Sequence, residues 1–272
     1  ATALRIRVDS AQGAIGTRAI AVHDLDFARD ANGFLEVLAA HTPRGTWPRM
    51  FSGEMTNWTA AGDPDSDYEL LVGELGAIEM YKAGPRLEPV LRVGEELLTW
   101  ADASVETGLH GGHLPLPWVR WTAAEHELMI ETCAIGDEAM LRYTVTNTGG
   151  ARSEGELMLA IRPVQVLPQW QFLNTVGGRA YVESLDVNTS EIAVNVTRRV
   201  RAMQPASRIG ASAFDSGEVV GRLLSGDAMP SAGVRDPLGL ASGVMGFDWS
   251  LMPGESVSFG FVLRIVDEED AQ

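Results

Sequence analysis

Cysteine and basic side chains are both scarce in this sequence. One cysteine, Cys133, occurs among 272 residues, which excludes an intramolecular disulfide and leaves the redox environment open. The chain has only 21 lysines and arginines but 37 acidic residues, so its net charge at pH 7 is −16. This charge argues against nucleic acid and against an anionic membrane as partners, because both would be repelled. It suits a neutral or cationic ligand.

Long apolar runs and the common catalytic motifs are missing as well. No stretch approaches the length of a membrane-spanning helix, and the N-terminal A-T-A-L-R-I-R-V is not typical of a signal peptide. No G-x-S-x-G motif and no glycine-rich phosphate-binding motif occurs. We therefore expect no cofactor and assign no catalytic residue, and the sequence predicts no cellular compartment.

Strand patterns dominate what is present. Helical periodicity is limited to one short candidate, Asp30 to Ala40. Segments that alternate apolar and polar residues recur along the chain, beginning with A-L-R-I-R-V at residues 3–8, and Gly, Asn and Asp clusters separate them. Many strands with few helices predict a mainly β protein with two large antiparallel sheets packed face to face.

The region from Gln204 to Gly243 has a different composition, rich in Gly, Ala, Ser and Pro. Its apolar positions include Phe214, Val219 and Leu223. A flexible linker would not need them, so we predict a long ordered excursion with a short helical part.

Two histidines lie close together in T-G-L-H-G-G-H-L-P, His110 and His113. Their spacing would suit a metal ion on a helix, but Gly111, Gly112 and Pro115 disfavour a helix there, and we predict no metal site. The glycines would let the backbone approach a ligand, with the imidazoles as hydrogen-bonding groups. The alternative is an ordinary surface loop.

Tryptophans beside planar polar side chains form the most informative pattern. Sugar recognition uses flat aromatic faces together with amide and guanidinium groups. Trp118 and Trp121 are three residues apart, so on a strand one lines a surface and the other faces the core. The alternative for all the tryptophans is packing inside the protein. The candidate ligand-binding residues are Trp170, Gln165, Gln169, Gln171, Asn174, Arg162, His110, His113, Trp118 and Arg120.

Several motifs resemble, in order, the large β-sandwich domain of bacterial multidomain glycoside-hydrolase-like proteins, some of which are described as coagulation factor 5/8 type. The motifs include L-P-L-P-W-V-R-W, L-R-Y-T-V-T-N-T-G, L-M-L-A-I-R-P-V-Q-V-L-P-Q-W-Q-F-L-N and F-D-W-S-L-M-P-G-E. The similarity extends from Thr99 to Val266, and the third motif is the most specific. It implies a β-supersandwich of the galactose-mutarotase-like superfamily, which in such proteins usually precedes an (α/α) toroid with the catalytic carboxylates. No comparable set of helices occurs here.

The resemblance leads us to expect that residues 1–272 form a single β-supersandwich domain taken from a longer protein. Its expected role is carbohydrate-associated and without turnover of its own, packing on or contributing to the sugar site of an adjacent helical toroid domain. One alternative is a stand-alone aldose epimerase or mutarotase, with His110 or His113 facing a carboxylate in a deep site. Another is a protein-interaction module.

The segment from Leu159 to Gly178 carries the most specific motif. It begins like a buried strand and then collects an arginine, three glutamines and a tryptophan. We predict that it leaves its sheet at Pro163 and crosses the sandwich surface as an extended ledge. Its polar groups would face a sugar or the neighbouring toroid. Arg162 should be its most buried and most fully paired side chain.

Overall fold

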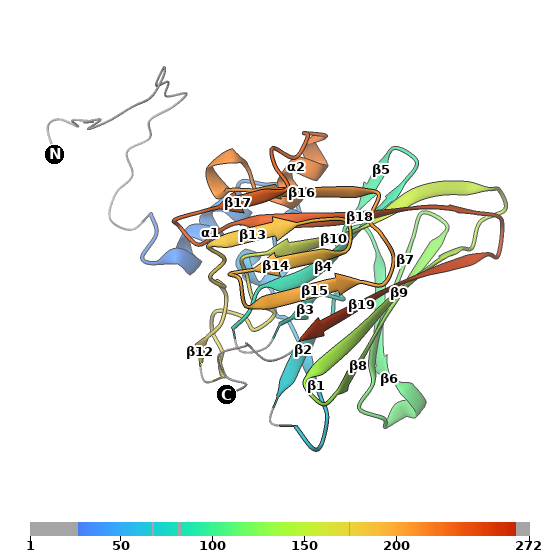
Figure 1. Cartoon of the computed structure of the whole chain (residues 1–272), viewed down its shortest axis with the longest axis horizontal. Coiled ribbons are helices and arrows are strands. Elements are labelled where there is room, and N and C mark those ends of the chain that lie inside the picture. Colours follow the sequence, from blue (N-terminus) through green and yellow to red (C-terminus); the bar gives the residue numbers. More distant parts are fainter. Residues whose placement is uncertain (1–26, 67, 81–82, 174, 265–272) are drawn as a thin grey trace, which may run out of the picture.

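The computed structural model describes residues 27–66, 68–80, 83–173 and 175–264. The strand predicted at residues 3–8 and the candidate Asn174 lie outside these residues. Within them, the strands form two large sheets whose neighbouring strands are all antiparallel (Figure 1).

Sheet A contains eight of the described strands, in the order β1-β2-β3-β4-β10-β18-β16, with β5 paired to β4. Its strands are β1 (Trp58–Gly62), β2 (Glu69–Gly73), β3 (Ile78–Glu79), β4 (Arg86–Val93), β5 (Glu96–Leu98), β10 (Ser153–Arg162), β16 (Arg208–Ser212) and β18 (Ser242–Leu251).

Sheet B contains nine of the described strands, in the order β17-β13-β14-β15-β19-β9-β8-β7-β6. Its strands are β6 (Ser104–Leu109), β7 (Pro117–Ala123), β8 (His126–Ile135), β9 (Glu138–Asn147), β13 (Ser184–Val187), β14 (Glu191–Val194), β15 (Arg198–Ala202), β17 (Gly233–Arg235) and β19 (Ser256–Arg264).

A small hairpin and short helices complete the described chain. The hairpin pairs β11 (Phe172–Leu173) with β12 (Thr175–Val176). The helices are α1 (Ala31–Ala40), α2 (Val219–Ser225) and the 3₁₀ turns η1 (Arg49–Ser52), η2 (His110–Gly112) and η3 (Phe214–Ser216). The predicted helix at Asp30 to Ala40 is therefore confirmed, with Asp30 capping it by accepting a hydrogen bond from the Gly33 N–H at 2.9 Å.

The core lies between the two sheets. Strands β8 and β9 alternate buried and more exposed residues, as a sheet with one covered face requires. Aromatic rings from both sheets meet there, since the Phe247 ring of β18 lies 5.3 Å from the Phe261 ring of β19. Tyr143 of β9 also packs edge to face on Phe261. The predicted mainly β fold, with two large antiparallel sheets face to face, is thus confirmed.

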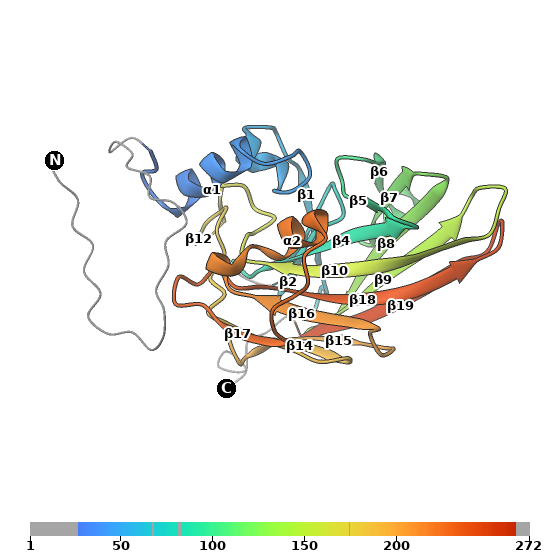
Figure 2. The ribbon, with the colours of Figure 1, turned by 90° about the horizontal axis from the view of Figure 1, so that it is seen from above.

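The outer face of sheet A is covered as well. Met158 and Ala160 of β10 are buried against Val219 and Val220 of α2, so the end of β10 is buried on both faces. Figure 2 shows α1 and α2 on one side of the molecule, with β14, β15 and β17 on the opposite side. The excursion after Gln204 is ordered and contains the predicted helix, α2. Its two strands, β16 and β17, were not predicted.

Candidate functional site

The segment of residues 163–180, called the ledge from here on, follows β10. It leaves sheet A after Arg162, as predicted. The prediction of an extended path is wrong, because the ledge folds back on itself. The Gln165 N–H donates to the Gly178 carbonyl at 2.6 Å, and the Ala180 N–H donates to the Pro163 carbonyl at 2.9 Å. The turn depends on Gly178, whose φ is +97° and whose position has no room for a Cβ beside Asn32.

Arg162 anchors the base of the ledge and is fully buried, which confirms the prediction made for it. Its Nε and Nη2 donate to the two oxygens of Glu218 at 2.8 and 3.0 Å, and its Nη1 donates to Glu88 at 3.1 Å. Nη2 also donates to the Thr46 carbonyl at 2.7 Å, and the guanidinium lies over the Trp47 ring. Every one of these contacts is with the protein itself, so Arg162 holds β4, β10 and α2 together.

A second buried carboxylate fixes the backbone of the ledge. Glu79 Oε2 accepts hydrogen bonds from the Val166 and Leu167 N–H groups at 2.7 and 2.9 Å. Burial raises the pKa of Glu79 to about 7, while these two N–H groups and Arg86 oppose the rise. The ledge is therefore held by a carboxylate that changes its charge near neutral pH.

The three glutamines of the ledge also bind protein groups. Gln165 is buried and donates to the carbonyls of Val176 and Arg179 at 3.0 and 2.6 Å. Gln169 donates to Glu36 of α1 at 2.8 Å and to the Met50 carbonyl at 3.1 Å. These bonds tie the ledge to itself, to α1 and to η1.

Gln171 braces the ledge against sheet A. Its side-chain oxygen accepts a hydrogen bond from the indole N–H of Trp58, in β1, at 2.8 Å. Trp58 is itself half-buried against a small cluster that contains Val166 and Leu167 of the ledge. The glutamines predicted as ligand contacts thus have a structural role in the positions they occupy here.

The tip of the ledge, by contrast, is apolar and exposed. The exposed fractions are 46% for Trp170, 73% for Phe172, 40% for Leu173 and 59% for Val176. Of the seven tryptophans, Trp170 is the most exposed. A rigid ledge therefore presents one large aromatic ring and three apolar side chains to the surroundings.

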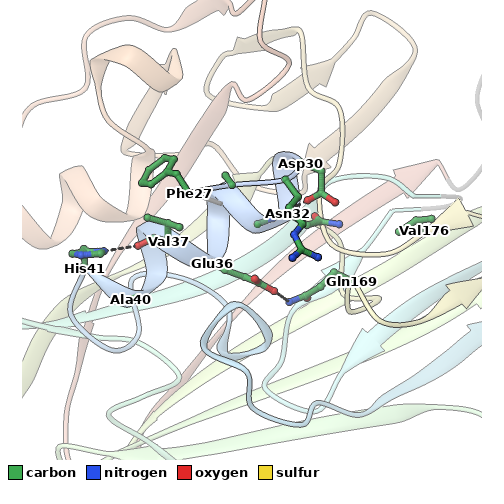
Figure 3. A pocket seen from close by; sticks show the side chains of 12 residues that line it. Phe27, Asp30, Asn32, Glu36, Val37, Ala40, His41, Gln169 and Val176 are labelled. Carbon is green, nitrogen blue, oxygen red and sulfur yellow. Dashed lines mark hydrogen bonds between the residues drawn. The ribbon is translucent and has the colours of Figure 1, made fainter. Parts of the chain in front are cut away.

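A hollow of about 610 Å³ opens beside the ledge, between Gln169, Val176 and α1 (Figure 3). Figure 3 shows the Glu36 carboxylate reaching from α1 to the Gln169 amide. Asn32 of α1 donates to the Gly177 carbonyl and accepts from the Arg179 N–H, at 3.0 and 2.8 Å. The hollow thus has amide and carboxylate groups along its edge.

The other predicted side chains gather on the outer face of sheet B. His110 Nε2 lies 2.9 Å from Glu131 Oε1, and Arg142 lies 2.7 Å from Glu131 Oε2. Arg120 pairs with Glu106 and Glu127, both at 3.2 Å, and lies over the half-buried Trp118 ring. Sheet B therefore collects His110, Trp118 and Arg120, whereas Trp170 and the glutamines belong to the ledge.

The tryptophans of β7 and the two histidines before it can be compared with their predicted positions. Trp121 is buried and donates to the Leu75 carbonyl at 3.1 Å, while Trp118 points outward, so their predicted opposite orientation is confirmed. His113 is exposed, and the contact its ring makes is with the Gly111 carbonyl. The carboxylate partner of His110 is present, but the His110 side chain is 43% exposed, so the pair is not in a deep site.

Sequence patterns alone did not single out Glu131, Arg142, Glu36, Asn32 or Trp58. The signal for the first two lies in the strand register, because Trp118 is opposite Glu131 and Glu131 is opposite Arg142. Side chains of such opposed residues share one face of a sheet. Without the register, Glu131 and Arg142 are ordinary polar residues of alternating strands.

The described residues contain neither a cluster of metal-ligating side chains nor a membrane-spanning helix. No group of three or more His, Cys, Asp or Glu side chains is placed there to hold a metal ion. In the same part of the chain, no helix has the length and apolar character to span a membrane.

No protein-family model matches the sequence, and no curated protein is significantly similar to it. Among solved structures, one that is similar is a proposed aldose 1-epimerase from Escherichia coli K12, with 10% identity and a TM-score of 0.44 over 77% of this chain and 99% of that one. Others are a proposed kojibiose phosphorylase from the human microbiome (10% identity, TM-score 0.36) and a GH92 inverting mannosidase from Bacteroides thetaiotaomicron (11% identity, TM-score 0.24). The similarity to the phosphorylase covers 77% of this chain and 25% of that protein. The similarity to the mannosidase covers 80% of this chain and 28% of that protein.

Proposed function

We propose that this chain is a carbohydrate-associated β-sandwich module without turnover of its own, and that the tip of the ledge is its contact surface. In this proposal residues 1–272 are one domain of a longer protein, and the tip meets a sugar next to an adjacent helical toroid. The motif resemblance described above supports the carbohydrate association.

The observation that carries the proposal is the exposure of Trp170 on a ledge that is otherwise tightly held. Apolar side chains gathered at one exposed tip are typical of contact surfaces. The bonds of Gln169, Gln171 and Glu79 restrict the motion of the ledge, which lowers the entropy lost when a ligand binds. A preorganised indole face with carboxylate and amide groups nearby is the arrangement that sugar recognition uses.

Tryptophan fluorescence tests this function. The purified chain is titrated with a panel of mono- and oligosaccharides, and we expect a saturable change that disappears in Trp170→Ala. Trp118→Ala is the matched control, because Trp118 is an accessible tryptophan on sheet B and its removal should leave the response intact. A flat response of the wild type across the panel would contradict sugar binding and favour a protein-docking role for the tip.

One observation favours the alternative of a sugar epimerase or mutarotase, namely the 2.9 Å contact between His110 and Glu131. Interconversion at an anomeric carbon needs an acid and a base within hydrogen-bond reach of the substrate. Both oxygens of this carboxylate already have a partner, however, because Oε1 contacts His110 and Oε2 contacts Arg142, so neither oxygen is open to a substrate in this arrangement. Polarimetry on fresh glucose and galactose distinguishes the two functions. If the chain accelerates the change in optical rotation and Glu131→Gln does not, the epimerase or mutarotase function replaces the non-catalytic one.

A further inference from the structure

The outer face of sheet B contains a second hollow, of about 510 Å³, which we call the trough. It lies over β8, β9 and β19, on a different sheet from the ledge. His110 and Leu116, from the connection between β6 and β7, line one side. Met203 and Gln204, which follow β15, line the other side, so the trough has two walls.

The floor of the trough has an apolar part, whose position follows from the strand register. Cys133 is opposite Met140, and Arg142 is opposite Gly260. A Cβ on Gly260 would lie 2.5 Å from the sulfur of Met203, so the bare glycine gives Met203 room to lie over the floor. Sulfur-containing side chains are polarisable and adapt to the shape of a nonpolar surface. The floor thus suits the C–H face of a small molecule.

The polar groups of the trough leave one strong hydrogen-bond donor open. Both oxygens of Glu131 have partners, since Oε1 contacts His110 and Oε2 contacts Arg142. Arg142 uses its Nε and Nη2 in this contact, and no described residue accepts a hydrogen bond from its Nη1. The Arg142 side chain is 61% exposed at the trough. The charge of Arg142 thus balances that of Glu131, while the edge of the guanidinium that carries Nη1 has no partner among the described residues.

We propose that the trough binds a small organic carboxylate that also has a nonpolar C–H face. The free edge of Arg142 would receive the carboxylate, because guanidinium groups match carboxylates in geometry and charge. The C–H face would lie on Cys133, Met140 and Met203. The net charge of −16 does not prevent this contact, since physiological salt screens distant charges beyond about 8 Å. Two sources have this chemistry, an acidic sugar such as a uronate and an aromatic or aliphatic acid.

The single thiol supplies the measurement, because Cys133 lines the trough and is the one cysteine of the chain. The rate of its alkylation by iodoacetamide, a neutral reagent, is measured with glucuronate and with 3-phenylpropanoate. Glucose and 3-phenylpropanamide are the matched neutral probes. We expect a carboxylate to slow alkylation several-fold at saturation, and its neutral counterpart to have little effect. Protection by glucuronate alone identifies an acidic sugar, and protection by 3-phenylpropanoate alone identifies a nonpolar acid.

Arg142→Gln is the decisive variant, and it should weaken the protecting carboxylate about tenfold or more, because hydrogen bonds to charged groups are among the strongest in proteins. Arg120→Gln is its matched control, on the same face of sheet B but outside the trough, and should retain the wild-type affinity. Titration calorimetry with the same four probes on Trp170→Ala, which lacks the sugar response of the ledge, gives an independent affinity for the trough. If Arg142→Gln does not fold, the comparison of each carboxylate with its neutral counterpart on the wild type still tests the proposal.

Three results would overturn the proposal: no binding of either carboxylate, equal binding of the neutral probes, or full binding by a folded Arg142→Gln. The proposal does not depend on the function of the ledge. Trp170→Ala should keep the protection of Cys133 by carboxylates even though it loses the fluorescence response to sugars. The two ideas can therefore fail separately.

Discussion

The ledge and the trough use similar polar side chains in opposite ways. At the ledge, Arg162 and the glutamines bind protein groups and hold a loop in place, and what remains exposed is an apolar tip. At the trough, His110 and Arg142 each contact Glu131 on an open strand face, and what remains exposed is a guanidinium edge beside apolar side chains. The burial of a polar group therefore decides whether it supports the structure or remains free for a ligand.

The largest expected effect separates a buried arginine from an exposed one. Arg162→Met leaves Glu218 buried without its cation and Glu88 with Arg86 alone, at 3.4 Å, and should lower the free energy of unfolding by about 3 to 5 kcal/mol. Arg142→Ala removes an exposed partner and should cost about 1 kcal/mol or less. Urea unfolding of both variants measures the difference. Equal, small losses would show that the Arg162 network does not stabilise the ledge.

The second effect concerns pH and Glu79. Its pKa is raised to about 7 in the folded protein, so the folded state binds this proton more tightly than the unfolded state does. The resulting stabilisation is fully present below the unfolded value of 4.5 and is lost as the pH rises through 7. Glu79→Gln keeps an oxygen for both ledge N–H groups but cannot ionise. Between pH 5 and pH 8 the wild type should therefore lose up to about 3 kcal/mol relative to this variant.

Urea unfolding of both proteins at intervals between pH 5 and pH 8 measures this loss. Two parallel curves would mean that Glu79 does not change its charge in this range.

The smallest effect compares one glycine from each region. Gly178→Ala places a side chain at a φ of +97° and against Asn32, and should cost about 1 to 3 kcal/mol. Gly260→Ala lies in an ordinary strand and displaces the flexible end of Met203, so its cost should stay within about 1 kcal/mol. Thermal unfolding ranks the two variants. A larger loss for Gly260→Ala would show that the floor of the trough is the more rigid region.

Much of the fold follows from local patterns. Alternating residues predicted the two sheets and the opposite faces of Trp118 and Trp121, and the position of Pro163 agreed with the predicted end of β10. The burial of Arg162 was also predictable, because a charged residue at the end of an apolar strand needs partners. The ledge residues were harder to interpret, since a glutamine that binds a ligand and one that braces a loop have the same sequence pattern.

Local sequence thus specified most of the strands, though not β16 and β17, and which of their faces are apolar, because backbone geometry makes side chains alternate along a strand. The partners of each polar group depended on the closed structure. Glu88, Arg162 and Glu218 come from β4, β10 and the start of α2, and they lie together only after sheet A has formed and α2 has packed on it. Likewise, Glu131 meets Arg142 and His110 through strand register and a loop that folds over β8. Contacts between distant residues arise from strand order and packing, which no local pattern encodes.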